Sequence, residues 1–412
     1  MQLPTLCKLP NWRPSGRYLV LPHLVVATNR TQQRLAGRSV LKPDLDLSAY
    51  RFKVVFDWIE FEVHLGRTTQ AQHVQSVLRR HLDRNSLITP IDPGPGDTFT
   101  RCAIKIQDPP NMAFVAEIYR DLVGVYGEVE GSRVMAIEVS VDAYPRVPSD
   151  DARGQLLGAM QRTIWTGRDI WSDPASRPRS VARRGKSAVV KLTPKPEEAG
   201  TKSCASNPHN HRAPFIDGTM YLGRRDGDFM IRVMDKVKDK QRPDGTVEHL
   251  TDERRRVRVE VTLRGGELLS LGITDVPSLR RLKVAALKKR FFQFKLPAFQ
   301  VTSPVRKVSE ATRNFFEARR AHTYLTNGVI GLTAMDMALA ECRRRDRPAQ
   351  LAAQRKQFQN MGLTLHPRSR KPRLEPALVS WTELNRKVDV AFRKLEDRED
   401  TAWRRLGEVG SA

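Results

Sequence analysis

Between residues 217 and 264 the chain alternates apolar and polar positions with a period of two, the pattern of half-buried β-strands. The alternation begins near Met220, breaks at Asp226-Gly227 and resumes from Phe229 to Lys236. Because an Asp-Gly pair tolerates positive φ, it suits a tight turn between two strands. After a polar loop, a third run has valines alternating from 257 to 261. We therefore predict a hairpin and a third strand, each with one buried face and one open, polar face.

Elsewhere in the chain, apolar residues recur either with the period of two of a strand or with the spacing of a helix. Alternation predicts strands over Val54–Val63, Phe99–Gln107 and Val134–Asp142. Helical spacing of apolar residues predicts a helix capped by Thr69, a second helix from Asp108-Pro-Pro and a third over 151–166, with a Pro/Gly loop at 88–97 between the first two. Strands with one polar face, interleaved with helices, predict an α+β fold. We expect a mostly antiparallel sheet with helices on one face, followed by a basic, all-helical C-terminal region.

The distribution of proline, serine and basic residues suggests how the chain is divided. Residues 1–50 are rich in proline and arginine and are predicted to form an N-terminal arm. Residues 51–298 are predicted to form the main domain. It is interrupted at 172–214 by a Pro/Ser/Arg/Lys-rich stretch that we interpret as a mobile insertion, with a short strand at 188–192. Residues 299–412 are predicted to form a helical, basic domain, with helices near 306–325, 331–345, 348–361 and 380–407.

The net charge of the chain limits the classes of partner that the protein is expected to bind. The 412-residue chain carries a formal net charge of +25, which favours a polyanionic partner, and nucleic acid is the default. No run of about 18 apolar residues is present and no cleavage site follows the first apolar patch, so neither a membrane span nor a signal peptide is expected. Four cysteines without paired spacing are typical of a reduced cytoplasm.

The polar faces of the predicted strands supply the candidate chemistry. The face of the central strands collects a phenol, several cations and a carboxylate, a set that suits phosphoryl transfer: Tyr221, Arg232, Lys236, Arg258 and Glu260. The strand at 134–142 adds Glu138 and Asp142 on one face. They lie roughly 13 Å apart along a regular strand, too far to bind one cation unless the strand is bent or bulged.

Each of these features also has a simpler interpretation. A tyrosine can be a half-buried strand aromatic, and carboxylates are ordinary on an exposed sheet face. His209-Asn210-His211 is more consistent with a solvent-facing pair than with a metal cluster. Asp57 is a further acidic candidate or a satisfied, partly buried carboxylate. Basic stretches are often solvated faces, but a phosphate-backbone role is predicted for the following cations: Arg224, Arg225, Arg254, Arg255, Arg256, Lys288, Lys289 and Arg290.

The ordered motifs of the central strands resemble the replication initiation factor family of rolling-circle plasmids and filamentous phages (the Rep-trans type), which includes relaxases of some conjugative elements. The motifs are Thr219-Met-Tyr-Leu-Gly-Arg-Arg225, Arg232-Val-Met-Asp-Lys236 and Arg258-Val-Glu260. Upstream, Asp57-Trp58 and the pair Glu138 and Asp142 are similar to acidic positions of the family. The resemblance covers roughly residues 52 to 296.

The resemblance implies a nickase that cuts one DNA strand at an origin. A tyrosine would attack the phosphodiester, form a 5′-phosphotyrosyl link and leave a free 3′-OH for a polymerase. A divalent cation (Mg²⁺ or Mn²⁺), held by Glu138, Glu260 and, if the strand is bent, Asp142, would polarise the phosphate. The implied partners are origin DNA as duplex, hairpin or single strand and a host helicase and polymerase, with a homodimer also considered. The implied location is the cytoplasm of a bacterial host.

One position departs from the family pattern. The family usually has tyrosine where this chain has Met234, and that tyrosine is expected to be the nucleophile. Two hypotheses follow: either Tyr221 performs the attack, or the protein binds origin or single-stranded DNA without cutting it. A third hypothesis, a basic RNA- or membrane-associated protein, explains the charge but not the ordered motifs.

Overall fold

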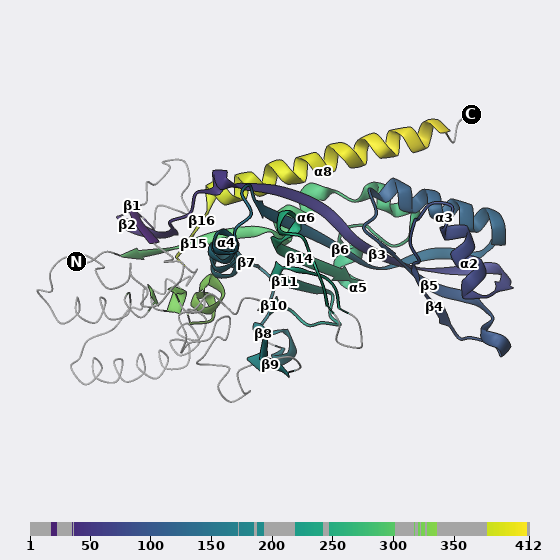
Figure 1. The fold of residues 1–412 in the computed structure, drawn as a ribbon, viewed down its shortest axis with the longest axis horizontal. Coiled ribbons are helices and arrows are strands. Elements are labelled where there is room, and N and C mark those ends of the chain that lie inside the picture. The colour runs from purple at the N-terminus through teal and green to yellow at the C-terminus, as the bar shows by residue number, and fades with distance from the viewer. Residues whose placement is uncertain are drawn as a thin grey trace, which may run out of the picture.

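The computed structural model describes residues 18–22, 35, 37–171, 173–184, 188–192, 219–241, 247–300, parts of 317–335, and 377–409. Within these residues the predicted α+β fold is confirmed (Figure 1). Nine antiparallel strands form the main sheet in the order β4-β5-β3-β6-β14-β11-β10-β8-β9. A smaller sheet joins β1, β2, β15 and β16, with β7 beside β15. The candidate histidine pair, together with Cys204, lies outside the described residues.

Two long strands form the axis of the main sheet. They are β3 (Tyr50–Thr69) and β6 (Glu128–Pro145), which pair along most of their length. The other strands of this sheet are β4 (Leu87–Ile91), β5 (Phe99–Gln107), β8 (Arg179–Arg184), β9 (Ala188–Leu192), β10 (Thr219–Leu222), β11 (Phe229–Lys236) and β14 (Arg256–Arg264). The predicted hairpin and third strand are therefore confirmed as β10, β11 and β14.

The remaining strands lie outside the main sheet. They are β1 (Tyr18–Pro22), β2 (Arg38–Pro43), β7 (Ile164–Trp165), β15 (Gln293–Gln300) and β16 (Leu378–Ser380), with the separate pair β12 (Lys238–Gln241) and β13 (Val247–His249). β1 and β2 come from the predicted N-terminal arm, and β2 pairs with β15. Residues of the arm and of the chain near 298 thus share one sheet.

Helices cover the apolar face of the main sheet, because its inward positions are almost all Val, Ile, Leu or Phe. They are α2 (Ala71–Leu78), α3 (Met112–Tyr126), α4 (Asp150–Thr163), α5 (Gly265–Ser270), α6 (Val284–Phe291) and α8 (Thr382–Val409). In Figure 1, α8 runs along β3 for most of its length, while α2 and α3 lie at one end of the sheet. Trp381, Leu384 and Val388 join the same buried cluster as the sheet residues.

Three local predictions were wrong. Thr69 ends β3, and Gln70 precedes α2 without a side-chain cap, because the strand continues to the helix. The helix predicted from Asp108 begins at Met112, where the side chain of Asn111 accepts from the backbone N–H of Phe114. The loop predicted from residue 88 contains β4, which pairs with β5 despite its proline at an edge position.

The C-terminal region is confirmed as helical at α8 and contributes β16 in addition. The helices predicted within 306–361 fall mostly outside the described residues, as does most of the 172–214 stretch. The strand predicted at 188–192 is confirmed as β9.

Candidate metal centre

The register of the central strands brings the predicted polar residues together on one face of the sheet. Arg232 on β11 lies opposite Glu260 on β14, and Arg258 lies opposite Asp142 on β6. Thr262 lies opposite Glu138. Since directly opposed residues in an antiparallel ladder point to the same side, these side chains face one another across three strands.

The prediction that this face is open was wrong. Glu138 is only 1% exposed, Glu260 and Asp142 are 2% exposed, and Arg258 is 3% exposed. The physical reason is that carboxylates and guanidinium groups on neighbouring strands pair and cover one another. A face made of both charge signs can therefore be as dry as an apolar core, provided that every ion has a partner.

A β-bulge adds a third carboxylate. The register of β3 against β6 shifts between Phe56 and Trp58, so Asp57 is an extra residue in the strand and its side chain reaches the polar face. Carboxylate oxygens of Asp57, Glu138 and Glu260 lie within 4.8 Å of one another. We call these three residues the carboxylate triad. Three hard oxygen donors at this spacing suit Mg²⁺ or Mn²⁺.

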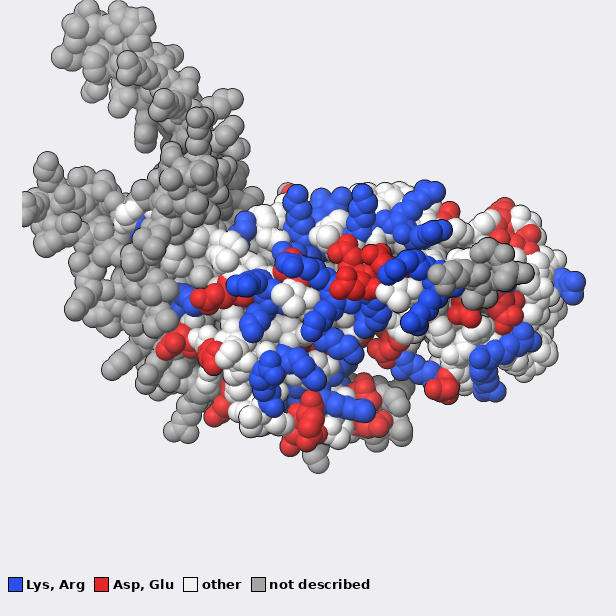
Figure 2. Space-filling model, turned by 90° about the horizontal axis from the view of Figure 1, so that it is seen from above, with Lys and Arg blue, Asp and Glu red and all other residues white. Residues whose placement is uncertain are grey.

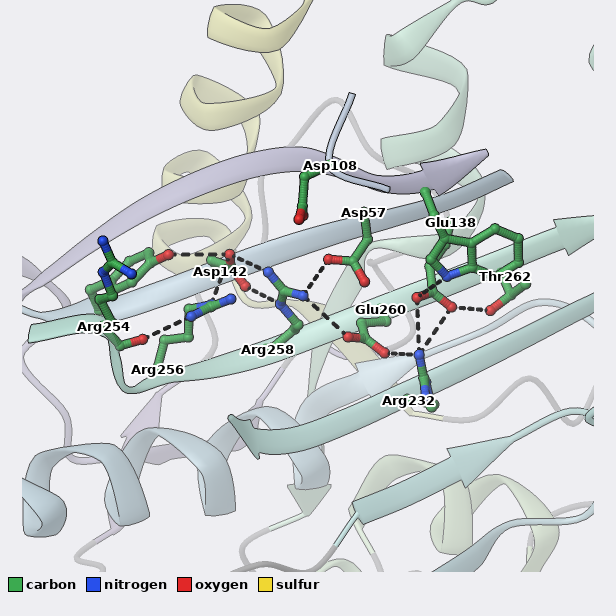
Figure 3. Close-up of polar contacts among 12 residues, drawn as sticks. Asp57, Asp108, Glu138, Asp142, Arg232, Arg254, Arg256, Arg258, Glu260 and Thr262 are labelled. Atoms are coloured by element: carbon green, nitrogen blue, oxygen red, sulfur yellow. Dashed lines mark hydrogen bonds and ion pairs between the residues drawn. The ribbon is translucent and has the colours of Figure 1, made fainter. Parts of the chain in front are cut away.

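Arg232 and Arg258 hold the triad together (Figure 3). Nη2 of Arg232 lies 3.0 Å from both carboxylate oxygens of Glu138 and forms an ion pair with Glu260. Nη1 of Arg258 donates to Asp57 at 2.5 Å and to Glu260 at 3.4 Å. Oε2 of Glu260 touches Arg232 but accepts no hydrogen bond from it. Arg232 and Arg258 therefore use their N–H donors to pair with the carboxylates of this site.

Neutral donors fix the orientation of Glu138. The indole Nε1 of Trp58 donates to its Oε1 at 2.7 Å, and the hydroxyl of Thr262 donates to its Oε2 at 2.5 Å. Both donors stabilise the charged carboxylate, and both come from the strands that flank β6. From the sequence, Trp58 was named only within the Asp57-Trp58 pair of the family resemblance, and Thr262 was assigned no role.

Two triad members have pKa values shifted in opposite directions. Burial raises the pKa of Glu260 to about 7, against the opposing influence of Arg232. Burial also acts to raise the pKa of Asp57, but Arg258 and then a hydrogen bond with Glu138 bring it below the ordinary value. A shared proton near Glu260 is expected of carboxyl groups held this closely together.

Asp142 lies apart from the triad. Arg258 binds it through two nitrogens, Nε at 2.5 Å and Nη2 at 2.8 Å, and Arg256 lies 3.0 Å away. The hydroxyl of Tyr144 donates to it at 3.3 Å. β6 carries Glu138 and Asp142 as separate partners of two different arginines, and Asp57 is the residue that completes the acidic group.

Tyr221 lies one strand beyond Arg232. It is opposite Arg232 in the ladder of β10 and β11 and opposite Arg179 of β8. The guanidinium carbon of Arg179 is 5.1 Å from the centre of the phenol ring. The phenol is half-buried between these two cations. Met234 lies opposite Arg258 and shares the polar face, as predicted, together with Lys236.

The predicted DNA-binding cations divide into paired and unpaired groups. Arg224 pairs with Asp226, Arg255 with Asp252, Lys288 with Asp389, and Arg290 with Glu267, whereas Arg256 belongs to the Asp142 cluster. Arg225, Arg254 and Lys289 are exposed and make no ion pair among the described residues. Figure 2 shows that Lys and Arg also spread widely over the face seen from above, with smaller acidic groups between them.

Among the comparisons with known proteins, the similarity found is to solved structures. No family model and no curated protein matches the chain. A solved structure of a rolling circle replication initiator protein from Geobacillus stearothermophilus aligns with 63% of this chain and 91% of its own, at 10% identity and a TM-score of 0.28. Within the described residues, no helix is long and apolar enough to cross a membrane.

Proposed function

We propose that this protein binds origin DNA and nicks one strand in a metal-dependent reaction, as a rolling-circle replication initiator of a mobile element. The observation that carries the proposal is the carboxylate triad: three carboxylates from three strands converge within 4.8 Å on a basic protein. Carboxylates gathered at one point repel one another; Arg232 and Arg258 offset part of this repulsion, and a bound divalent cation would offset more. The motif resemblance and the net charge of +25 point to DNA as the substrate.

The triad fits a divalent cation by its donor chemistry. All three groups are carboxylates, and Oε2 of Glu260, a residue only 2% exposed, pairs with Arg232 without accepting a hydrogen bond. A bound Mg²⁺ or Mn²⁺ would polarise the phosphodiester and offset the charge that develops on its oxygens. Arg232 and Arg258 pair with the carboxylates and hold them in position in its absence.

Tyr221 is the proposed nucleophile. Its phenol oxygen would form a bond to phosphorus while the bond from phosphorus to O3′ breaks, leaving the 5′ end on the tyrosine. The phenol proton passes to solvent water as the bond forms, and the departing O3′ takes a proton from solvent water to become the free hydroxyl. Arg179, which lies against the Tyr221 ring, and Arg232, opposite Tyr221 in the ladder, would offset the negative charge that develops on the phosphate oxygens during the attack.

A second candidate function is a DNA-binding protein on the same fold that does not cut. Met234 favours it, because a thioether stands where the family resemblance implies the nucleophilic tyrosine. The two functions share the DNA-binding surface and differ only in the covalent step. Both candidate functions share the other proposals. These are a host helicase and polymerase as partners, a homodimer, and the cytoplasm of a bacterial host as the location.

A nicking assay tests the proposal. Purified protein is mixed with supercoiled plasmid carrying the element's own origin and with Mg²⁺ or Mn²⁺, beside a chelated sample and the Asp57→Asn variant. Relaxed circles that depend on metal and on Asp57 support the nickase. Salt-sensitive binding of the origin without relaxation under either metal would overturn the nickase and leave the non-cutting function.

A further inference from the structure

Two cations beside the carboxylate triad form no ion pair with any acidic residue that the structure describes. Lys105 on β5 places its Nζ 3.4 Å from the centre of the Trp58 ring, and the guanidinium carbon of Arg264 on β14 lies 5.9 Å from the same ring. Both side chains are half-buried, and neither makes an ion pair within the described part of the chain. Arg232 and Arg258, in contrast, form ion pairs with carboxylates.

Trp58 connects these cations to the triad. Its ring binds Lys105 by a cation–π contact, and its Nε1 donates to Glu138 at 2.7 Å. Burial lowers the pKa of Lys105, while Glu138, Glu60 and Asp57 act in the opposite direction. The ammonium group therefore lies within electrostatic range of two triad members without pairing with either. A half-buried cation in this position gains most from an anion supplied by a ligand.

We propose that Lys105 and Arg264, positioned by Trp58, bind backbone phosphate of a DNA strand on the Glu138 side of the triad. Trp58 is a positioning residue, since its ring face and its N–H are both occupied by protein groups. The inference rests on the proposed function for its substrate class. It assigns the phosphate contact to cations that the motifs did not include and leaves Arg232 and Arg258 to organise the carboxylates.

Single-strand binding without metal tests this assignment apart from cleavage. Fluorescence anisotropy follows a labelled oligonucleotide of the origin strand, in chelator, across a salt series. Lys105→Met and Arg264→Met should each weaken binding about 5-fold or more at low salt. Each should also reduce the slope of log K against log salt by about 0.7, the value for one phosphate contact on a single strand. The matched controls are Lys394→Met and Arg405→Met, exposed cations on α8.

The control variants distinguish a local phosphate contact from the nonspecific effect of removing one positive charge. Equal losses in the α8 variants, or unchanged slopes in Lys105→Met and Arg264→Met, would overturn the proposal. Thermal melts of each variant, with midpoints close to that of the unmodified protein, show that the loss is not unfolding. Competition by inorganic phosphate separates the two sources of the anion: displacement of the oligonucleotide at millimolar phosphate would mean a site for free phosphate and would overturn the strand assignment.

Trp58→Phe tests the positioning role. This change keeps an aromatic ring beside Lys105 but removes the N–H that binds Glu138, so oligonucleotide binding in chelator should stay within about 2-fold while metal affinity falls. Loss of oligonucleotide binding with retained metal affinity would contradict the arrangement. Because these assays use no cleavage, a failed nicking experiment leaves the phosphate contact standing, and a failed phosphate contact leaves the nickase standing.

Discussion

Glu399 on α8 offers a measurable test of how the C-terminal helix is held against the sheet domain. Its Oε2 accepts a hydrogen bond of 2.8 Å from the N–H of Met112, the first residue of α3, whereas its Oε1 has no hydrogen-bond partner among the described residues. Burial raises the pKa of this carboxyl to about 7, and the bond from Met112 opposes the rise only in part. The folded protein therefore holds this proton more tightly than the unfolded chain does.

The sign and size of the effect follow from this difference. The stabilising contribution of the protonated Glu399 is complete below the ordinary value of 4.5 and is lost as the pH rises through about 7. At 1.36 kcal/mol per pKa unit, ionising the buried group costs the folded state about 3 kcal/mol at most by pH 8. Glu399→Gln keeps an oxygen for the N–H of Met112 and cannot ionise. It should raise the free energy of unfolding by up to about 3 kcal/mol at pH 8 and by nearly nothing at pH 4.5.

Denaturant titrations of both proteins at the two pH values measure this difference. Other buried carboxyls, including Glu260, titrate alike in both proteins and cancel in the comparison. Asp397→Asn, at an exposed position of the same helix, serves as the matched control and should show no gain at either pH. An equal gain at both pH values, or none at pH 8, would refute the reasoning from burial.

Three further predictions concern the sheet and the triad. Gly223 has φ +86°, and an added Cβ would lie 2.6 Å from the carbonyl oxygen of Phe229, so Gly223→Ala should cost about 1–3 kcal/mol in a denaturant titration; full stability would contradict that strain. Arg258→Met leaves buried carboxylates without their cation and should cost about 3–5 kcal/mol at pH 7, with a smaller loss in acid; an unchanged melting midpoint would be inconsistent with the ion-pair network. The pKa of Glu260, raised to about 7, makes protons compete with metal, so Mn²⁺ affinity by calorimetry should rise with pH up to about 7 and then level off. Glu260→Gln should bind Mn²⁺ weakly and without this pH dependence, and retained tight binding would exclude Glu260 as a ligand.

Strand periodicity predicted the sheet well because it depends on which residues face the core. The alternation over β10, β11 and β14 gave the strands and the face on which Arg232, Arg258 and Glu260 lie. The same reasoning could not show that the face is closed. Burial of a charged face depends on pairing across strands that are far apart in sequence, as Arg258 and Asp57 are, and a single-strand pattern does not contain that information.

The sequence around Asp57 contains a signal from which its position on the polar face could have been predicted. Along β3 the buried positions run through Val54 and Phe56 and then through Ile59 and Phe61, so the period of two skips one residue. A skip of this kind predicts a β-bulge, and the extra residue is the one whose facing changes. The starts of α2 and α3 were less predictable from the sequence. The start of α2 depends on where β3 ends and the start of α3 on the cap at Asn111, and both depend on how neighbouring elements pack.

Met234 occupies the motif position at which the family resemblance implies a tyrosine. Its side chain lies on the polar face beside Arg258, while Tyr221 lies on the adjacent strand β10, opposite Arg179 and Arg232. Because the cations that would activate a phenol gather at Tyr221, the nucleophile proposed for this chain is displaced from the usual position in the motif.

Mapping of a covalent protein–DNA adduct tests the central claim most directly. The protein is incubated with a single-stranded origin oligonucleotide and Mn²⁺, then digested with protease, and the peptide that carries nucleotide is sequenced by mass spectrometry. The account predicts a 5′-phosphotyrosyl adduct on the peptide that contains Tyr221, absent in Tyr221→Phe and after chelation. An adduct on another tyrosine, such as Tyr144, or no adduct with an oligonucleotide that the protein binds, would contradict it.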